Sequence, residues 1–587
     1  MGKKYYTIER NVQIMIYLLK AHGIKKVIAS PGTTNMTFIG SIQQDPWFEI
    51  YSSVDERSAA YLACGMAAES GEPVVLSCTG ATASRNYLPG LTEAYYRKLP
   101  VIALTSHRGD YRIGHVLDQQ IDRRQSQNDI AVEKVTIPLV KDAEDEAYCI
   151  LQANKALLAL KRRGGGPVHI NMFTKYSLEF SVKELPKVKV INRFTIWDKL
   201  PMLKQEWKVA VFVGSHRPFT KDETEIIDSF CATHNAVVFC DHTSGYHGKY
   251  EVHFALVCAQ RNYDSPLRSM DVLIHIGEVS GNAYGLSLKA GVVWRVSEDG
   301  ELRDTFNNKL TKVFEMPESV FFKKYSNSDE LSDDSYLKAC KAEYATLLSE
   351  LPELPFSNIW IASHMHTMLP LNSELHLGIL NSLRAWNFFE IDKSIQTNSN
   401  VGGFGIDGGV SSLIGASLIN PNRLYFGVFG DLAFFYDMNV VGNRHVGNNV
   451  RLLLINNGRG NEFRNYGHIC HQFGKDADAY MAAAGHYGNQ SPQLVKHYAE
   501  DLGYLYLTAS DKVSFLKNLD TFLTPEIINC PIIFEVFTQS NDESDSIELM
   551  LNFKRDNATA FKRKIAMNIA GTPLEGVVNA VRKIIQQ

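Results

Sequence analysis

The chain has 587 residues, of which 45% are hydrophobic and 21% are charged. This composition is typical of folded proteins, and a prior of roughly 150 residues per domain predicts three or four domains. The 60 Lys and Arg against 64 Asp and Glu leave a net charge of −4, so no basic field attracts a nucleic-acid backbone. No apolar run reaches the ~18 residues that a membrane span needs, and no apolar segment follows the N-terminal lysines. We expect a cytoplasmic protein without nucleic-acid or membrane partners.

The cysteines number 9, which is odd, and they are scattered and mostly lie in apolar stretches. They are Cys64, Cys78, Cys149, Cys231, Cys240, Cys258, Cys340, Cys470 and Cys530. A free Cys in such a stretch behaves as a small hydrophobic residue. We therefore expect no disulfides.

The first third of the chain alternates helical and strand patterns. Apolar residues recur at helical spacing over 11–21, and the β-branched run 25–29 stops at Ser30-Pro31-Gly32. The alternation continues with a helix at 59–69, a strand at 73–78, a helix at 91–98 and a strand at 101–105. Continuous apolar strands between helices indicate a parallel sheet that is covered on both faces.

Two further regions repeat this organisation. The second follows the polar stretch 183–201, has strands at 209–213, 236–240 and 271–276, and ends in the Ser-, Asp- and Glu-rich segment 326–335. The third has strands at 424–428, 450–455 and 532–536. We predict an α/β fold of three doubly wound parallel-sheet domains, 1–185, 200–330 and 350–540, followed by a basic helical tail, 541–587, that packs as a solvated helix.

The richest candidate site lies in the third region. The strand 424–428 runs into Gly430-Asp431, a helix covers about 433–441, and the strand 450–455 runs into Asn456-Asn457-Gly458. Since parallel strands open their carboxyl ends onto one crevice, Asp431 and Asn457 point at the same place. A carboxylate with amide or carbonyl oxygens suits Mg²⁺, completed by water and substrate phosphates. The alternative is that both residues only cap helix N-termini.

Two other motifs allow different interpretations. Residues 403–408 satisfy the dinucleotide pattern, and Asp431 lies near the position of the ribose-binding acid, so a nicotinamide site is one alternative. The preceding segment, 397–402, is polar and is not the buried strand that this motif requires. Val54-Asp55-Glu56-Arg57 opens a helix, where carboxylates commonly serve as caps and dipole partners.

A histidine pair follows Asn457 in His468-Ile469-Cys470-His471. The spacing is too close for the usual zinc patterns. An active-site loop explains these residues better than a zinc site does.

Taken in this order, Ser30-Pro31-Gly32, Asp55-Glu56-Arg57, Gly430-Asp431 and Asn456-Asn457 resemble the motifs of the thiamine diphosphate-dependent decarboxylase and carboligase superfamily, of the acetolactate synthase and pyruvate decarboxylase architecture. Within it, residues 381–383, 405–408 and 430–439 look similar to the 2-succinyl-5-enolpyruvyl-6-hydroxy-3-cyclohexene-1-carboxylate synthases of menaquinone biosynthesis. The resemblance covers the first and third domains directly and, by motif order, the whole chain. It implies pyrimidine-binding, central and diphosphate-binding domains.

The resemblance assigns the cofactor residues. Asp431, Asn457 and the backbone carbonyl of Arg459 match the ligands of the Mg²⁺ that holds thiamine diphosphate. Glu56 matches the glutamate that binds the aminopyrimidine ring, and Gln119 resembles a glutamine near the reacting centre. Further cofactor positions are matched by Gly32, Ser382, Gly405, Ile406, Gly430, Leu432 and Phe463, of which Ile406 is the apolar residue that bends the cofactor and Leu432 stands where many members have glycine.

The resemblance also bears on substrate and assembly. Because Glu56 and Asp431 lie in different domains, which the superfamily brings together across a subunit interface, it implies a homodimer or homotetramer. Thr34 and Val401 stand where the synthases have arginines, so the pocket loses bidentate carboxylate recognition. Substrate contacts are expected from Thr33, Thr34, Arg108, Arg384, Val401, His468 and His471.

We therefore expect thiamine diphosphate-dependent decarboxylation of a small or weakly charged 2-oxo acid. The resulting acyl anion is transferred to an acceptor or protonated. The alternatives are a nicotinamide-dependent oxidoreductase and the menaquinone-pathway synthase reaction itself.

Overall fold

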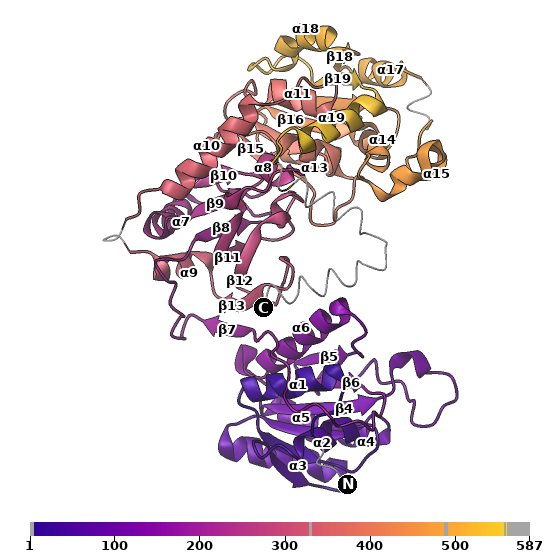
Figure 1. Cartoon of the computed structure of the whole chain (residues 1–587). Helices are drawn as coiled ribbons and strands as arrows, with labels where there is room; N and C mark the ends of the chain where they lie inside the picture. Colours follow the sequence, from indigo (N-terminus) through magenta and orange to yellow (C-terminus); the bar gives the residue numbers. More distant parts are fainter. Residues whose placement is uncertain (1–4, 328–330, 486–490, 557–558, 560–587) are drawn as a thin grey trace. The chain divides into compact units, whose positions relative to one another are not determined.

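The computed structural model describes residues 5–327, 331–485, 491–556 and 559. Helices and strands alternate through the chain and build three sheets (Figure 1). The strands pair in parallel, which confirms the predicted α/β fold with parallel sheets. The chain divides into two compact units. The N-terminal unit comprises Met1–Thr195, Gly300–Asp304 and Leu310–Val313, and the C-terminal unit comprises the rest.

The N-terminal unit contains a sheet with the strand order β2-β1-β3-β4-β6-β5. Its strands are β1 (Lys26–Ala29), β2 (Glu49–Ser52), β3 (Val74–Thr79), β4 (Val101–His107), β5 (Glu133–Ile137) and β6 (Val168–Phe173). Its helices are α1 (Arg10–Ala21), α2 (Met36–Ile42), α3 (Glu56–Ser70), α4 (Thr82–Asn86), α5 (Leu88–Tyr96) and α6 (Ala143–Ala159). Strands β3 and β4 are buried at every position, as their continuous apolar runs predict.

Helices cover both faces of this sheet, because successive side chains of a strand point to opposite sides. Ile102 and Leu104 of β4 pack with α1 and α6 in one apolar cluster. Val101 and Ala103 pack with α3 and α5 in the other. The N-terminal sheet is therefore buried between two layers of helices.

The C-terminal unit begins with a sheet whose strands β10, β9, β8, β11 and β12 lie side by side in that order and run parallel. These strands are β8 (Val209–Val213), β9 (Val237–Cys240), β10 (Glu251–His253), β11 (Ser269–Ile276) and β12 (Lys289–Ser297). The helices are α7 (Lys221–His234), α8 (Ala255–Ala259), α9 (Glu318–Tyr325) and α10 (Ser335–Ser349). Two further strands, β7 (Asn192–Thr195) and most of β13 (Leu310–Glu315), belong to the N-terminal unit. The strand order reverses direction between β8 and β11, where α/β sheets open a crevice at the carboxyl ends of their strands.

The last sheet has the order β15-β14-β16-β17-β19-β18. Its strands are β14 (Glu374–Leu377), β15 (Gln396–Asn398), β16 (Tyr425–Gly430), β17 (Val450–Asn456), β18 (Leu505–Ala509) and β19 (Ile532–Phe537). Its helices are α11 (Asn358–Met365), α12 (Asn381–Trp386), α13 (Gly409–Ser417), α14 (Asp431–Val441), α15 (Ala477–Tyr480), α17 (Leu494–Asp501), α18 (Lys512–Phe522) and α19 (Ser540–Asn552). Helix α14 begins at Asp431, which is earlier than the predicted start near 433.

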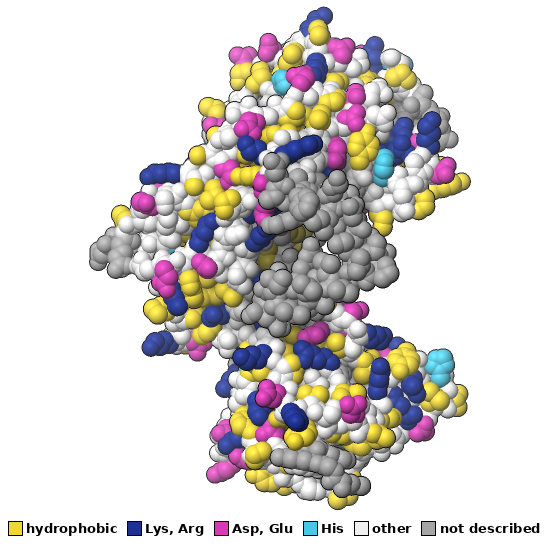
Figure 2. All heavy atoms as spheres, in the orientation of Figure 1, with side chains coloured by type: hydrophobic (Ala, Val, Ile, Leu, Met, Phe, Trp, Pro, Cys, Tyr) yellow, Lys and Arg dark blue, Asp and Glu magenta, His cyan; other side chains and the backbone are white. Residues whose placement is uncertain are grey.

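Helix α19 contains the first part of the predicted tail, whereas residues 557–558 and 560–587 lie outside the described residues. The predicted domain boundaries remain predictions, because the compact units group the second and third sheets together. All nine cysteines are free, as expected. No helix of the described residues is long and apolar enough to cross a membrane. Figure 2 shows basic and acidic side chains interspersed over the visible face.

Candidate active site

The predicted metal ligands lie together at one edge of the last sheet. Strands β16 and β17 are parallel neighbours, and Gly430 at the end of β16 pairs with Ile455 near the end of β17. The side chain of Asp431, which is only 2% exposed, accepts a hydrogen bond at Oδ2 from the backbone N–H of Gly458 at 2.8 Å. The carboxylate therefore contacts the loop that contains Asn457.

Asn457 supplies the oxygen that suggests a ligand. Its Oδ1 is buried and has no hydrogen-bond partner among the described residues. Such a buried acceptor costs about 1–3 kcal/mol when unsatisfied. A cation coordinated by Asn457 Oδ1 and the Asp431 carboxylate would remove this cost, and these oxygen donors match the preference of Mg²⁺. The residues therefore fit the predicted metal.

The alternative that Asp431 and Asn457 only cap helix N-termini explains their positions only in part. Helix α14 has Gly430 as its N-cap, without a side-chain cap bond. Asp431 is the first helical residue, where its charge favours the helix dipole, and its Oδ1 accepts from the N–H of Leu432 at 2.8 Å. The next helix after Asn457 is the 3₁₀ helix η5 (Asn461–Arg464), whose N-cap is Gly460. Capping therefore gives Asn457 no role.

A small pocket at the same edge contains further predicted cofactor residues. It lies at the carboxyl ends of β14 and β15 and beside the start of α14, and Gly405 and half-buried Ile406 line it. Gly430 borders open space, since a Cβ there would meet no atom within 4 Å. The backbone of Gly460 lies against Leu432 and Phe463, because a Cβ there would come within 3.2 and 3.3 Å of their side chains. These residues thus surround the Asp431 edge.

The segment 403–408 has the spacing of a dinucleotide-binding motif, but the strand and helix around it differ from those of that motif. The strand before it is β15 (Gln396–Asn398), a half-exposed edge strand of 3 residues. The helix after it, α13, begins at Gly409. A dinucleotide fingerprint instead joins a buried strand directly to a helix.

Arg384 is bound by a carboxylate that sequence analysis did not single out. Its Nη1 and Nη2 donate to Oε2 and Oε1 of Glu462 at 2.6 and 3.0 Å. Burial lowers the pKa of Arg384, but the Glu462 carboxylate raises it further, so the net shift is upward. The only signal for Glu462 in the sequence was its place in the loop after Asn457. Ser382, on the same helix as Arg384, is buried and accepts from Asn358 Nδ2 at 3.2 Å.

The histidine pair makes local contacts in the loop after η5. His468 Nδ1 accepts from the N–H of Cys470 at 3.1 Å, and its ring lies edge-on to Phe463. His471 Nδ1 contacts the carbonyl of Arg464 at 3.0 Å. Among the described residues no group of three His, Cys, Asp or Glu side chains could hold a metal, so nothing here supports zinc. The Arg459 side chain donates to Asp478 at 2.9 Å, and the role of the Arg459 carbonyl stays a prediction.

In the N-terminal unit, Glu56 opens α3 at the carboxyl edge of the sheet, where the chain also leaves β1, β3 and β4. The cap of α3 is Asp55, whose Oδ1 accepts from the N–H of Arg57 at 2.8 Å and of Ser58 at 3.3 Å. Glu56 is half-buried and accepts from Asn86 Nδ2 at 3.1 Å. The capping role belongs to Asp55, which leaves Glu56 available for another task.

The loop after β1 packs directly on the end of β3. A Cβ on Gly32 would lie 2.1 Å from the Thr79 side chain, so this position requires glycine. Thr33 is exposed. Thr34 is buried and donates from Oγ1 to the carbonyl of Ser106 at 2.5 Å. The Thr34 side chain therefore fixes the loop to the end of β4 and does not project into solvent.

The other two predicted residues of this unit lie around the loop after β4. Arg108 donates from Nη2 to Asp118 Oδ2 at 2.9 Å. Gln119 is exposed and has a φ of 57°, which is unusual for a residue with a side chain. Val401 in the C-terminal unit is buried. The two arginines among the predicted substrate contacts, Arg108 and Arg384, are thus each bonded to a carboxylate.

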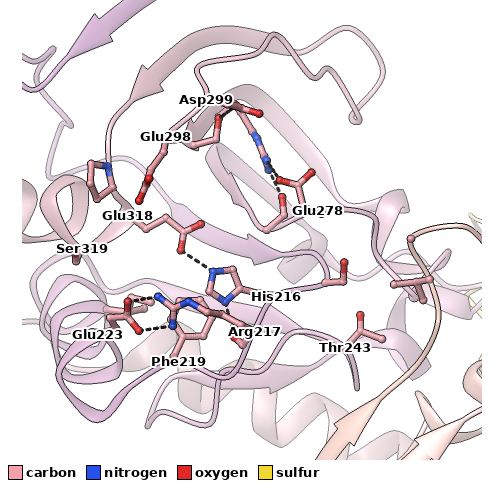
Figure 3. A pocket seen from close by; sticks show the side chains of 18 of the residues that line it. His216, Arg217, Phe219, Glu223, Thr243, Glu278, Glu298, Asp299, Glu318 and Ser319 are labelled. Carbon is pink, nitrogen blue, oxygen red and sulfur yellow. Dashed lines mark hydrogen bonds and ion pairs between the residues drawn. The ribbon is translucent and has the colours of Figure 1, made fainter. Parts of the chain in front are cut away.

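Another cavity of about 640 Å³ lies in the C-terminal unit at the carboxyl ends of β8, β11 and β12 (Figure 3). It shares the wall residues 398–400 with the small pocket, and the predicted substrate residue Val401 also lines it. Arg217 pairs with Glu223, and His216 lies 3.4 Å from a carboxylate oxygen of Glu318 (Figure 3). Arg295 pairs with Glu278 at 3.2 Å. Each guanidinium in the wall thus has a carboxylate partner, and further acids, Glu298 and Asp299, also line it. This charge balance disfavours the phosphates of a nucleotide.

Comparison with known proteins gives consistent matches. Residues 10–127 match the N-terminal TPP binding domain of thiamine pyrophosphate enzymes. The chain is 29% identical over 567 residues to a 2-succinyl-5-enolpyruvyl-6-hydroxy-3-cyclohexene-1-carboxylate synthase of Bacteroides fragilis, covering 92% of this chain and 98% of that protein. A protein of the same name from Flavobacterium johnsoniae is 28% identical over 547 residues, covering 90% of this chain and 95% of its own length.

Among solved structures, the thiamine diphosphate-dependent 4-hydroxybenzoylformate decarboxylase of Rhodococcus jostii is 16% identical, with a TM-score of 0.39, and the match covers 90% of this chain and 99% of that one. The family match and the full-length relatives agree with the motifs at both sheet edges. The chain is therefore a thiamine diphosphate-dependent enzyme, similar over most of its length to the 2-succinyl-5-enolpyruvyl-6-hydroxy-3-cyclohexene-1-carboxylate synthases.

Proposed function

We propose that this enzyme decarboxylates a 2-oxo acid and transfers the resulting acyl anion to an acceptor or protonates it. The observation that carries the proposal is the pair formed by buried Asp431 and half-buried Asn457, directly after the ends of β16 and β17. Asp431 is bonded to the loop of Asn457, whose own side-chain oxygen is buried without a hydrogen-bond partner among the described residues. This arrangement suits Mg²⁺ bound to a diphosphate.

Individual residues would bind the metal, support the cofactor and activate it. Asp431, Asn457 and the carbonyl of Arg459 would hold Mg²⁺, and Ile406 would support the bent cofactor. Glu56 would hold a proton at the aminopyrimidine nitrogen, which favours the reactive tautomer. Bound thiamine diphosphate supplies a thiazolium that accepts the electron pair when CO₂ leaves. Gln119 would lie near the reacting atoms.

We further propose a homodimer or homotetramer. Glu56 belongs to the N-terminal unit and Asp431 to the C-terminal unit. In the superfamily that the motifs resemble, these two positions meet across a subunit interface. The test is the mass of the enzyme in solution, for which a monomer that retains full activity would contradict the proposal.

The charges near the site favour a substrate with few carboxylates. Arg384 donates twice to Glu462, and Arg108 donates to Asp118. A guanidinium that already binds a carboxylate has little left for a second one. The second candidate function is the 2-succinyl-5-enolpyruvyl-6-hydroxy-3-cyclohexene-1-carboxylate synthase reaction itself, which the relatives with that name favour.

Two measurements test the proposal. Thiamine diphosphate with Mg²⁺ should raise the melting temperature, whereas NAD should not, since only a ligand of the native state stabilises it. Product analysis should then detect CO₂ release from pyruvate or another 2-oxo acid. A melting temperature that responds to NAD and not to thiamine diphosphate would refute the proposal. Preferred turnover of 2-oxoglutarate with isochorismate would select the second candidate.

A further inference from the structure

The N-terminal unit contains a second pocket, on the α3–α5 face of its sheet. The cavity has a volume of about 520 Å³. Its wall is formed by α4, α5, β4 and the segment 122–130, and includes Arg85, Leu88, Leu91, Ala103, Arg123 and Ile130. The predicted cofactor residues of this unit, Gly32 and Glu56, are not part of this wall.

The guanidinium of Arg123 is hydrogen-bonded to neutral side chains. Its Nη1 donates to Thr105 Oγ1 at 2.9 Å, and its Nη2 donates to Asn171 Oδ1 at 2.6 Å. Thr105 Oγ1 also lies 2.8 Å from His169 Nε2. Burial lowers the pKa of His169 to about 3, so the ring is neutral. This hydrogen-bond network orients Arg123 without cancelling its charge.

A second guanidinium faces the same space. Arg85 donates from Nη2 to the backbone carbonyl of Asp122 at 3.3 Å, while the Asp122 carboxylate binds Arg124 at 2.7 and 3.0 Å. Within the described parts of the chain, neither Arg85 nor Arg123 forms an ion pair. Burial lowers the pKa of Arg123 to about 10; nearby Cys78 and Asp110 oppose this shift, and repulsion from Arg85 adds a smaller lowering effect.

Two like charges at one half-enclosed cavity are costly unless an anion neutralises them. The cavity of Figure 3 shows the contrast, because there Arg217 is held by Glu223. Asp122 is an acid in the wall of this pocket, but Arg124 already binds its carboxylate, so a bound anion is the partner that would neutralise Arg85 and Arg123.

One part of the wall is apolar, whereas the side chains of Ser84, Asp122, Gln125, Ser126 and Gln127 make another part polar. Leu91, Ala103 and Ile130 are buried, and Leu88 is half-buried beside them. We propose that this pocket binds a small amphipathic anion, with a carboxylate or phosphate at Arg85 and Arg123 and an apolar body of about one ring against the leucines. Its volume is in the range of small-molecule sites.

The experiment uses the full chain and three probes: 4-phenylbutyrate, phenyl phosphate and the neutral 4-phenylbutan-1-ol. Calorimetry should show that one or both anions bind at least about tenfold more tightly than the alcohol, as expected for hydrogen bonds between charged groups. Comparison of the two anions identifies the acidic group. Saturating thiamine diphosphate with Mg²⁺ should leave the affinity unchanged, because the site is separate from the cofactor residues.

Variants locate the binding. Arg123→Gln and Arg85→Gln should each lower the affinity for the anionic probe by at least about tenfold. Arg97→Gln is the matched control, since Arg97 pairs with Glu93 and neither residue lines the pocket. Should Arg123→Gln fail to fold, Arg85→Gln still tests the proposal, because Arg85 is exposed. Wild-type affinity in both variants, competition with the cofactor, or no binding of either anion would overturn the proposal.

Discussion

The two oxygens of the Glu462 carboxylate accept hydrogen bonds from the two terminal nitrogens of Arg384, at 2.6 and 3.0 Å. Arg384 lies on α12 and Glu462 on η5, far apart in the sequence. The paired geometry is the one in which a guanidinium recognises a carboxylate most strongly. A residue that could recognise a substrate carboxylate is thereby neutralised by the protein itself.

Removing this partner should change substrate preference. In Glu462→Gln the Arg384 guanidinium keeps neutral acceptors, the new amide oxygen and Asn381 Oδ1, but its charge is no longer cancelled. KM for a dicarboxylate such as 2-oxoglutarate should therefore fall about tenfold relative to KM for pyruvate. Steady-state kinetics with both substrates gives this ratio. Glu462→Asp, which keeps the charge, is the control and should leave it near the wild-type value. An unchanged ratio in Glu462→Gln would place the pair outside the substrate pocket.

Asp431→Ala should abolish Mg²⁺-dependent binding of thiamine diphosphate, because it removes the carboxylate that neutralises the cation. Titration calorimetry with and without Mg²⁺ measures the effect. Asp437 is a suitable control on the same helix, since its carboxylate accepts from Ser411 and is not among the predicted ligands. Undiminished Mg²⁺-dependent binding in Asp431→Ala would rule out the proposed site.

Substitutions of the adjacent acids Asp55 and Glu56 should have different effects. The first should lower the stability of the protein, and the second should slow activation of the cofactor. Asp55→Ala removes the cap of α3 and should lower the melting temperature while cofactor activation persists. Glu56→Gln should retain the fold and cofactor binding, but hydrogen exchange at C2 of the bound cofactor should slow by orders of magnitude, because an amide cannot deliver the proton. NMR of the bound cofactor follows this exchange. Equal exchange in wild type and Glu56→Gln would return Glu56 to a structural role.

Glu543 should make stability depend on pH. It is buried and accepts from the N–H of Asn358 and the hydroxyl of Thr538, and burial raises its pKa from an ordinary 4.5 to about 7. The folded protein thus binds this proton more tightly than the unfolded chain, so the contribution of Glu543 to stability is greatest below pH 4.5 and is lost as the pH rises to about 7.

Glu543→Gln should remove this dependence. Denaturant unfolding at pH 5 and pH 8 should show that the free energy of unfolding of the variant, relative to wild type, is higher at pH 8, by about 1–3 kcal/mol. Glu548, a partly exposed acid on the same helix, provides the control variant Glu548→Gln. A difference between variant and wild type that is identical at both pH values would contradict the assignment.

The sequence by itself determined many of the buried strands and the proximity of Asp431 and Asn457. Strands such as β3, β4 and β17 are buried on both faces, so their apolar runs are continuous and easily recognised. Asp431 and Asn457 follow neighbouring strands of one parallel sheet, and parallel strands end at the same edge. Their proximity thus followed from local pattern alone.

Only the tertiary structure decided which charged side chains are neutralised. In the sequence Asp55 and Glu56 lie equally at a helix start, but the backbone N–H groups of α3 select Asp55 as the cap. Arg384 binds Glu462, whereas Arg123 has only neutral acceptors. These outcomes depend on contacts between segments distant in the chain, and the energy of a charge is set by its burial and nearest partner, neither of which a local sequence pattern records.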